Sequence, residues 1–385
     1  MNNSLLLTEE QLLLKKTLSE FSQKHIAPHA HLLDQNEQFP AENLQGLASL
    51  GVMGTGIDPE LGGSSGGYQE LAVVVEEIAK VCAGTSTSFI AHVSLTLATI
   101  YNFSRPDQRE KFVPGMIDGR DIGAWCLTEP DCGSDASALS CQVEKNNGSY
   151  IINGTKTFIT NANEASLFTV FARLNNQPGS KGIICLVVDR HSPGITINPL
   201  KGKMGIRASS TAEIDFNNTK VPAFNILGQE EDGFKIAMQI LDSSRIIIAS
   251  QAVGIAQGAL EKALSYSQQR QTFNRPLAQH QAIQFMLADC ATKIEAARLL
   301  TRRAALLKDQ NLPHTIESAM AKLFASETAH FVTDKALQIH GGYGFFKDNP
   351  VERYYRDAKI TEIYEGSSEI QRLVIARNIL KLYQI

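Results

Sequence analysis

The hydrophobic periodicity changes twice along this chain of 385 residues. Apolar residues recur at helical spacing up to residue 101, give way between Gly123 and Leu227 to short apolar or alternating runs, and return to helical spacing from Gly233. Turn clusters such as Asn146-Asn147-Gly148 separate the central runs, as is typical of strands joined by hairpins. The chain therefore predicts a β block between two α blocks. Because no internal repeat or low-complexity linker interrupts it, we expect the blocks to pack as one compact unit.

Three domains follow from these changes of periodicity, in a fold that is mainly α with one β domain. We expect an α-helical domain over residues 1–122, a β domain over 123–232 and an α-helical bundle domain over 233–385. Thr8 with Gln11 and Ser368 with Gln371 have the form of capping boxes and predict where the first and last helices begin. Further helices are expected at 44–50, 68–82, 85–101, 234–271, 279–310 and 314–340, and strands at 150–152, 167–174, 182–188 and 212–216.

The composition favours an ordinary globular enzyme without a nucleic-acid or membrane partner. The formal net charge is -4, so the chain carries no basic footprint for nucleic acid. No stretch approaches the ~20 apolar residues that cross a bilayer. The first ten residues have neither a basic region nor a long apolar run, which predicts a cytoplasmic protein. The six cysteines form no C-x-x-C pair, and His280 and His340 lack paired carboxylates, so we expect no metal site.

Three segments could carry chemistry, and each also has an ordinary structural interpretation. Glu365 stands in a tight turn before a helix whose first amides, from Ser367 to Glu369, would point at a ligand; it could equally be a solvated residue before a cap. The loop 125–135 offers amides and hydroxyls, but could be a Pro/Gly turn. In the strand at 153–161, Phe158 could face a ligand or the core. Neither G-x-G-x-x-G, G-x-x-x-x-G-K-[ST] nor G-x-S-x-G occurs.

Six segments together resemble the acyl-CoA dehydrogenase family, in the family's order and over essentially the whole chain. The family's two signatures are matched by residues 126–135 (CLTEPDCGSD) and 364–372 (YEGSSEIQR). Four further matches lie between them, at 203–211 (KMGIRASST), 270–273 (RQTF), 280–285 (HQAIQF) and 338–344 (QIHGGYG). The resemblance implies the family's fold: an α-helical N-terminal domain, a β-barrel middle domain and a C-terminal four-helix bundle.

The resemblance also implies a reaction, in which an acyl-CoA thioester loses its α proton and β hydride to give a trans-2-enoyl-CoA and reduced FAD. Glu365 matches the family's catalytic base. Some relatives place the base at the position matched by Ser244, which cannot serve. A buried carboxylate gains basicity, and hydrogen bonds to the thioester oxygen stabilise the developing enolate.

Residue by residue, the resemblance implies two binding sets. The substrate set is Ser134, Asp242, Ser243, Ser244, Arg245, Tyr364 and Gly366. The FAD set is Trp125, Leu127, Thr128, Ser134, Phe158, Ile159, Thr160, Arg270, Phe273, Gln281, Gln338, Ile339, His340, Gly341, Gly342, Ser367, Ser368 and Glu369. Arg270, Phe273, Gln281 and 338–342 match residues that reach the FAD of a neighbouring subunit, which implies a homo-oligomer, usually a tetramer.

Within the family the chain is most similar to the short-chain, butyryl-CoA type, through residues 245–257, 296–301 and 360–365. An electron-transfer flavoprotein would then accept the electrons. Short branched-chain dehydrogenases (isobutyryl- or 2-methylbutyryl-CoA), acyl-CoA oxidases and, last, a nucleic-acid-binding relative remain alternatives. The chain departs from the family pattern at Cys132, Phe158 and Ser243-Ser244, which bear on flavin packing and acyl-pocket shape.

Overall fold

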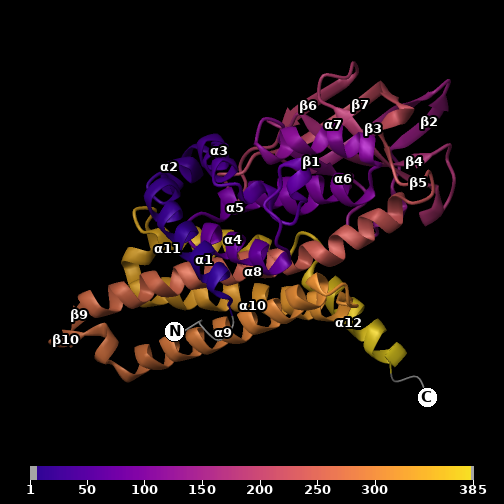
Figure 1. The fold of residues 1–385 in the computed structure, drawn as a ribbon. Coiled ribbons are helices and arrows are strands. Elements are labelled where there is room, and N and C mark those ends of the chain that lie inside the picture. The colour runs from indigo at the N-terminus through magenta and orange to yellow at the C-terminus, as the bar shows by residue number, and fades with distance from the viewer. Residues whose placement is uncertain (1–6, 383–385) are drawn as a thin grey trace.

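The computed structural model describes residues 7–382, in which helices precede and follow a sheet that lies at one end of the molecule (Figure 1). The N-terminal helices are α1 (Glu9–Phe21), α2 (Ala30–Asn36), α3 (Ala41–Ser49), α4 (Tyr68–Ala79), α5 (Ala83–Ile90), α6 (Ala98–Phe103) and α7 (Pro106–Ile117). The capping box predicted at α1 is confirmed. The amide of Gln11 donates to Thr8 Oγ1 and the amide of Thr8 donates to Gln11 Oε1, both at 3.2 Å.

The middle of the chain forms one eight-stranded sheet, as the alternating runs predict. Its strands are β1 (Gly123–Cys126), β2 (Gln142–Asn146), β3 (Ser149–Thr160), β4 (Leu167–Leu174), β5 (Ile183–Asp189), β6 (Ile195–Pro199), β7 (Thr211–Pro222) and β8 (Ile226–Leu227). They hydrogen-bond in the order β6-β7-β3-β2-β4-β5-β8, with β1 on β4. Within the described residues β6 and β8 do not pair with each other, so the hydrogen-bonded sheet stays open where the resemblance implied a barrel.

Strand β5 shows how the sheet packs on both faces. Ile184, Leu186 and Val188 point into the core between the strands. Ile183, Cys185 and Val187 point to the other face, against α7 and the first turns of α8 (Gly233–Gln269). Because successive side chains of a strand alternate between faces, a run that is apolar throughout must be covered on both.

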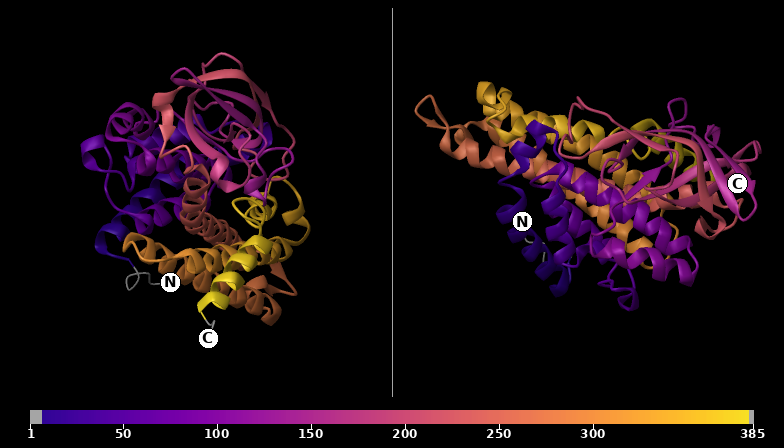
Figure 2. Two further views of the ribbon diagram at one scale, coloured as in Figure 1. Left: turned by 90° about the vertical axis from the view of Figure 1, so that its right-hand side faces the viewer. Right: turned by 90° about the horizontal axis from the view of Figure 1, so that it is seen from above.

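The C-terminal helices are long and bury α8 at their centre. After α8 come α9 (Gln281–Asp309), α10 (Thr315–His340), α11 (Pro350–Ile360) and α12 (Ser368–Leu382). Helix α8 packs against α4, α9 and α10. Its middle, from Ile246 to Ala249, is therefore buried on all sides, as expected of a helix that is apolar all round. Figures 1 and 2 show the N-terminal helices and the sheet on one side of this group, with the two-stranded hairpin β9 (Gln271–Thr272) and β10 (Arg275–Pro276) at its far tip.

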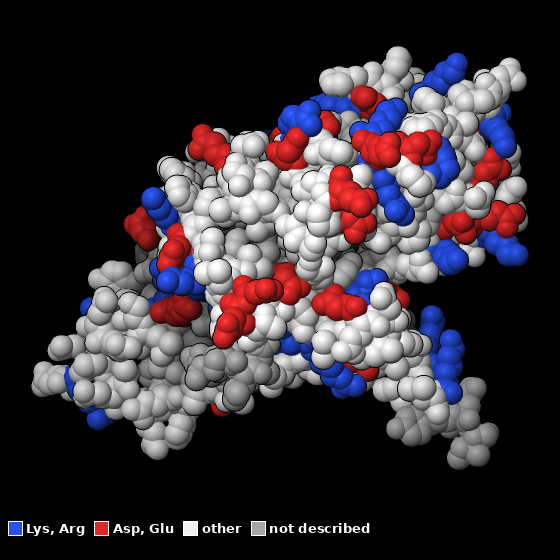
Figure 3. Space-filling model, viewed as in Figure 1, with Lys and Arg blue, Asp and Glu red and all other residues white. Residues whose placement is uncertain are grey.

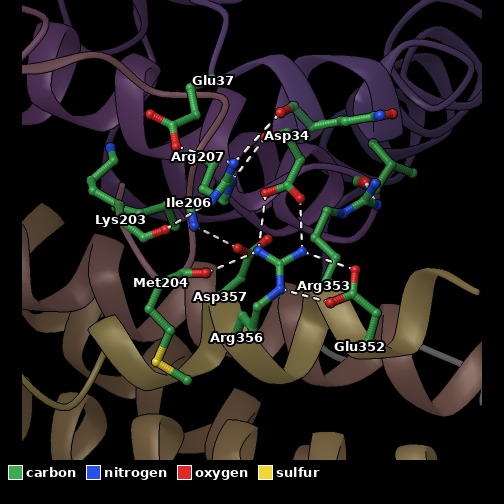
Figure 4. Close-up of polar contacts among 12 residues, drawn as sticks. Asp34, Glu37, Lys203, Met204, Ile206, Arg207, Glu352, Arg353, Arg356 and Asp357 are labelled. Carbon is green, nitrogen blue, oxygen red and sulfur yellow. Dashed lines mark hydrogen bonds and ion pairs between the residues drawn. The ribbon is translucent and has the colours of Figure 1, made fainter. Parts of the chain in front are cut away.

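A partly buried ionic cluster joins α2, α11 and the loop before β7 (Figure 4). Arg356 donates to Asp34 Oδ2 and Glu352 Oε2, each at 2.7 Å, and to the carbonyl of Met204 at 2.9 Å. Asp357 accepts the amide of Ile206 at 2.5 Å. Ile206 has a φ of +47°, which is unfavourable for a β-branched residue. The cluster therefore holds a strained loop between the N-terminal and C-terminal helices.

On the face drawn in Figure 3, basic and acidic side chains are interspersed over the sheet. Within residues 7–382, no helix combines the length and the apolarity needed to cross a membrane. All six cysteines are buried, and none of them forms a disulfide bond.

Candidate active site

Glu365 lies in a turn between α11 and α12 whose backbone is unusual. Glu365 has a φ of +50° and Gly366 a φ of +94°, so two successive residues adopt left-handed conformations. Glycine takes this conformation freely, whereas a glutamate does so at a cost of roughly 1 kcal/mol. The turn persists because its surroundings hold it, and strain of this kind is concentrated at functional sites.

Two side chains hold the turn through one carbonyl. Lys322 Nζ of α10 donates to the carbonyl oxygen of Gly366 at 2.7 Å, and Gln371 Nε2 of α12 donates to the same oxygen at 2.8 Å. Both side chains are fully buried. The capping box expected from Ser368 and Gln371 is therefore wrong, because the Gln371 amide turns back to Gly366. The helix begins with a weaker contact, from the amide of Ile370 to Ser367 Oγ at 3.5 Å.

The carboxyl group of Glu365 is poised to exchange a proton near neutral pH. Burial raises the pKa of Glu365 to about 7, although the neighbouring Ser244 hydroxyl, Lys322 and Arg245 act to lower it. Its Oε2 atom is shielded from solvent and has no hydrogen-bond partner among the described residues. An acid with such a pKa and a free oxygen is suited to general acid–base chemistry.

Helix α8 brings the expected substrate residues beside Glu365. Ser243, Ser244 and Arg245 are all buried there. Arg245 forms an ion pair with Asp242, which also accepts a hydrogen bond from Thr315 Oγ1 at 2.9 Å. Ser244 sits close to the carboxyl of Glu365 and donates to the carbonyl of Leu241 at 3.2 Å. The segment 242–245 and Glu365 thus come together from positions more than a hundred residues apart.

Tyr364 points into the protein, where it ends a polar chain that the sequence did not suggest. Its hydroxyl donates to Gln251 Oε1 on α8, and Gln251 Nε2 donates in turn to Thr87 Oγ1 on α5 at 2.8 Å. Gln251 is fully buried. A lone amide in the apolar run 246–256 was the signal that could have revealed it, because a buried amide must have partners.

A second group of expected residues lies on the sheet, around the loop after β1. The amide of Thr157 donates to the carbonyl of Thr128 at 2.9 Å and joins this loop to β3. The register of β3 against β7 shifts between Lys156 and Ile159, and Phe158 there has a φ of +57° and is 69% exposed. Thr160 is partly buried and Ser134 exposed. This bulge turns an aromatic face outward beside two threonines.

Three of the expected cofactor residues in this second group are oriented inward. Ile159 is buried in the core of the sheet, so its backbone alone can meet a ligand. Leu127 is likewise buried. The Trp125 indole donates to Thr99 Oγ1 at 3.1 Å and packs edge-on against Phe171, with ring centroids 4.9 Å apart.

A buried ion pair supports the loop from beneath. Lys156 Nζ is 2.7 Å from Glu129 Oε1 and donates to the carbonyl of Leu127 at 3.1 Å. Glu129 also accepts the amides of Ser140 and Cys141, at 2.6 Å and 3.1 Å. Both charged side chains are at most 1% exposed. Sequence analysis did not identify this pair.

The third group lies at the far end of α8, where a cavity of about 580 Å³ opens. Arg270, Ile339, His340, Gly341 and Gly342 line it, together with Tyr266 and Tyr343. The His340 ring stacks on Tyr266 at 4.3 Å. Outside the cavity lining, Gln338 and Gln281 are exposed and Phe273, at the hairpin tip, is 91% exposed. Within one chain this group lies far from the sheet (Figure 1).

These surfaces fit the parts of a flavin dinucleotide. The exposed ring of Phe158, on a strand that also carries Thr160 and whose Thr157 amide bonds to Thr128, suits a flat ring with polar edges. The cavity at the end of α8 offers the Arg270 guanidinium and the exposed backbone of Gly341 and Gly342, which suit an anionic pyrophosphate.

The chain belongs to the acyl-CoA dehydrogenase family. It matches the family's N-terminal domain over residues 8–120, its middle domain over 124–219 and its C-terminal domain over 231–380. The resemblance and the three-domain fold expected from it are confirmed. Acyl-CoA dehydrogenases are FAD-dependent oxidoreductases, so the expected enzyme class and cofactor are confirmed as well.

Three relatives illustrate the similarity. The chain is 45% identical to the short-chain specific acyl-CoA dehydrogenase of Bos taurus mitochondria, over 98% of this chain and 92% of that one. It is also 45% identical to the acryloyl-CoA reductase (NADH) of Anaerotignum propionicum, over 97% and 95%. The structure of butyryl-CoA dehydrogenase from Megasphaera elsdenii superposes with a TM-score of 0.95 at 42% identity, covering 97% of this chain and 99% of that one.

Proposed function

We propose that this protein dehydrogenates short-chain acyl-CoA thioesters, with Glu365 as the base that removes the α proton. The observation that carries the proposal is the Glu365 carboxyl group. Burial raises the pKa of Glu365 to about 7, and its Oε2 has no partner among the described residues. A base with this pKa is stronger than an ordinary carboxylate and is still substantially ionised at neutral pH.

The chain's own residues account for the proton and for the placement of the substrate. Glu365 Oε2 takes the α proton, and the positive charges of Arg245 and Lys322 keep the carboxylate ionised before that transfer. The amide of Glu365 is the donor that the resemblance assigns to the thioester oxygen, where negative charge develops. FAD, when bound, supplies the acceptor for the β hydride.

We further propose that the flavin site is completed by a second subunit, in a homotetramer. The sheet residues around Phe158 and the cavity residues around Arg270 lie at opposite ends of one chain (Figure 1). A single FAD therefore cannot contact both groups within one chain. Phe273, 91% exposed at the tip of the β9–β10 hairpin, is placed to reach another molecule. An electron-transfer flavoprotein as acceptor and a cytoplasmic location stay predictions.

The proposed preference for short acyl groups rests on the polar chain behind the base. Seven residues separate Ser244 from Gln251 on α8, which corresponds to about 10 Å along a helix. Gln251, Tyr364 and Thr87 close the space beyond that distance with mutually satisfied, buried hydrogen bonds. A longer acyl chain would have to break them, and each buried polar group left without its partner costs ~1–3 kcal/mol. Branched short substrates remain compatible with this arrangement.

A reductive direction is a second candidate, favoured by the acryloyl-CoA reductase relative. A carboxyl group with a pKa of about 7 is roughly half protonated at neutral pH. Glu365 could then donate its proton to the α carbon of a short enoyl-CoA. The same residues serve both directions, and the redox partner decides which one predominates.

The test is anaerobic reduction of the bound flavin by C4 to C8 straight and branched acyl-CoAs, alongside its reoxidation by short enoyl-CoAs. Glu365→Gln keeps shape but removes the base. It should bind flavin and butyryl-CoA nearly normally and reduce the flavin at least ~10²-fold more slowly. Glu369→Gln is the matched control for the base, because Glu369 is exposed and the resemblance places it on the flavin side, away from the substrate α carbon, so its effect on flavin reduction should be far smaller. Wild-type flavin reduction by Glu365→Gln would refute the proposed role.

A further inference from the structure

Lys322 is a buried lysine without a carboxylate partner. It lies in the first third of α10 and is fully inaccessible to solvent. Among the described residues no carboxylate oxygen lies within 4.0 Å of its ammonium group, whose hydrogen bond goes to the carbonyl oxygen of Gly366 at 2.7 Å. Burying an ammonium group without an ion-pair partner is costly, so such a residue calls for a specific purpose.

The other charged groups near the turn either form ion pairs of their own or face solvent. Arg245 on α8 pairs with Asp242. Glu362, which precedes the turn, is 2.5 Å from Lys359, and Glu369 on α12 is exposed to solvent. Lys322 is thus the positive charge near Glu365 that has no competing carboxylate in contact among the described residues.

We infer that Lys322 is a positioning residue for Glu365: its ammonium group holds the Glu365–Gly366 turn through the Gly366 carbonyl and supplies the positive charge that keeps the Glu365 carboxylate available as a base. The inference rests on the proposed role of Glu365. It deepens that role by naming the group that sets both the place and the charge state of the base.

The geometry of the turn supports the first part of this role. Gly366 and Glu365 both have positive φ, and the carbonyl between them and α12 receives two buried donors, Lys322 and Gln371. A Cβ atom on Gly366 would come within 2.6 Å of Gln371 Nε2. Gly366, the Gln371 amide and the Lys322 ammonium group therefore pack closely together. Together they fix the direction in which the carboxyl group of Glu365 points.

Electrostatics support the second part. Burial lowers the pKa of Lys322 to about 8, and the charge of Glu365 is the strongest influence that opposes this fall. Lys322 in turn acts to lower the pKa of Glu365 against the effect of burial. Near neutral pH, each group stabilises the charged form of the other.

Two variants separate the charge from the hydrogen bond. Lys322→Met and Lys322→Gln have side chains of equal length that end one atom short of Nζ, and both are neutral, but the glutamine can still donate. Gln371→Leu removes the second donor and leaves the charge. Ser326→Ala is the matched control, because Ser326 is buried one turn further along α10 and its hydroxyl bonds locally, to the carbonyl of Leu323 at 3.0 Å.

The direct readout is the protonation of Glu365 in the FAD-loaded enzyme, followed by infrared difference spectroscopy of the carboxyl band, with Glu365→Gln to assign the band. Both Lys322 variants should raise the pKa of Glu365 by about one unit, so the ionised fraction at pH 7 falls from about a half to about a tenth. Flavin reduction at pH 7 should slow about 5-fold in Lys322→Gln for that reason, and more in Lys322→Met, which also loses the hydrogen bond to Gly366. Gln371→Leu should slow reduction without moving the pKa.

The pH dependence distinguishes positioning from packing. At pH 9, where Glu365 is ionised in every variant, Lys322→Gln should recover most of the wild-type rate, whereas Lys322→Met should stay slow. An unchanged carboxyl titration in both Lys322 variants would overturn the inference, and so would an equal shift in Ser326→Ala. If Glu365→Gln reduces its flavin at the wild-type rate, the proposed function fails, and the infrared titration still shows separately whether Lys322 controls this carboxyl.

Discussion

The ion pair of Lys156 and Glu129 makes an asymmetric prediction about the loop after β1. In Lys156→Met, Glu129 loses one partner but keeps the amides of Ser140 and Cys141 and the Ser140 hydroxyl, at 2.6–3.1 Å. In Glu129→Gln, the buried ammonium group of Lys156 keeps the Leu127 carbonyl. Removing one member of a buried pair typically costs ~3–5 kcal/mol of folding stability. The cost is larger in the variant whose remaining partner keeps fewer hydrogen bonds.

Protonation sets an upper limit on each cost. At pH 7, protonating a glutamate that has lost its partner costs ~3.7 kcal/mol, because its ordinary pKa is about 4.3. Deprotonating a lysine that has lost its partner costs ~4.6 kcal/mol, because its ordinary pKa is about 10.4. Since Glu129 keeps three donors, we expect Lys156→Met to lose ~2–3 kcal/mol and Glu129→Gln ~4 kcal/mol. The double variant should lose less than the sum.

The measurement is thermal unfolding of the FAD-loaded enzyme at pH 7. For 385 residues an unfolding entropy of ~2.1 cal/mol/K per residue converts 1 kcal/mol into a shift of about 1.2 °C, so the two single variants should differ by about 2 °C. Burial opposes ionisation of Glu129, but Lys156 and Ser140 outweigh it and lower its pKa. The stabilisation that the ion pair gives to the fold is therefore complete above the ordinary pKa of a glutamate. It is lost as the pH falls through the lowered pKa of Glu129.

Two results would refute this account of the ion pair. If Lys156→Met were the more destabilised variant, the three donors to Glu129 would not be compensating its charge. If the double variant lost the full sum of the single losses, the two side chains would not be coupled at all. Ser137→Ala is a suitable control, because Ser137 is partly exposed and its hydroxyl donates to Asp135 within the same loop.

The sequence predicted the long elements well because burial on one or all sides leaves a strong periodic pattern. The ranges 167–174 and 314–340 agree with β4 and α10 to within a residue. Helices α2, α7 and α11 were not predicted. Helix α7 contains Pro114, and α11 is rich in charged and tyrosine side chains. Part of α11 is buried against other domains through ion pairs, which an apolar pattern cannot reveal.

The sequence predicted the site residues that a short stretch of sequence can reveal, and it missed the contacts between residues that are distant in the chain. Glu365 precedes a helix start, and that arrangement is visible within ten residues of sequence. Lys322 meets Gly366 across 44 residues, and Gln251 meets Tyr364 across 113. Gln251 is a single amide in an apolar stretch of α8, and Lys322 is a single charged residue on a buried face of small side chains in α10. The sequence shows that such a residue is buried and needs a partner, but the fold alone determines which partner it finds.

Two further predictions concern the acyl pocket and the ionic cluster of Figure 4. Gln251→Ala should open the space behind Tyr364 and raise the C6-to-C4 ratio of kcat/KM about 10-fold, measured with straight acyl-CoAs; an unchanged ratio would place the pocket floor elsewhere. Asp357→Asn should remove a pH dependence of stability. Burial raises the pKa of Asp357 to about 6, so its carboxyl stabilises the fold fully below its ordinary pKa of ~3.9 and loses that contribution as the pH rises through about 6. Wild-type protein should therefore lose ~1–3 kcal/mol between pH 4 and 6 relative to Asp357→Asn, whose amide oxygen can still accept the Ile206 N–H. Thermal unfolding at pH 4.5 and pH 7 measures that difference, and parallel pH profiles for the two proteins would show that the buried carboxyl of Asp357 does not titrate in this range.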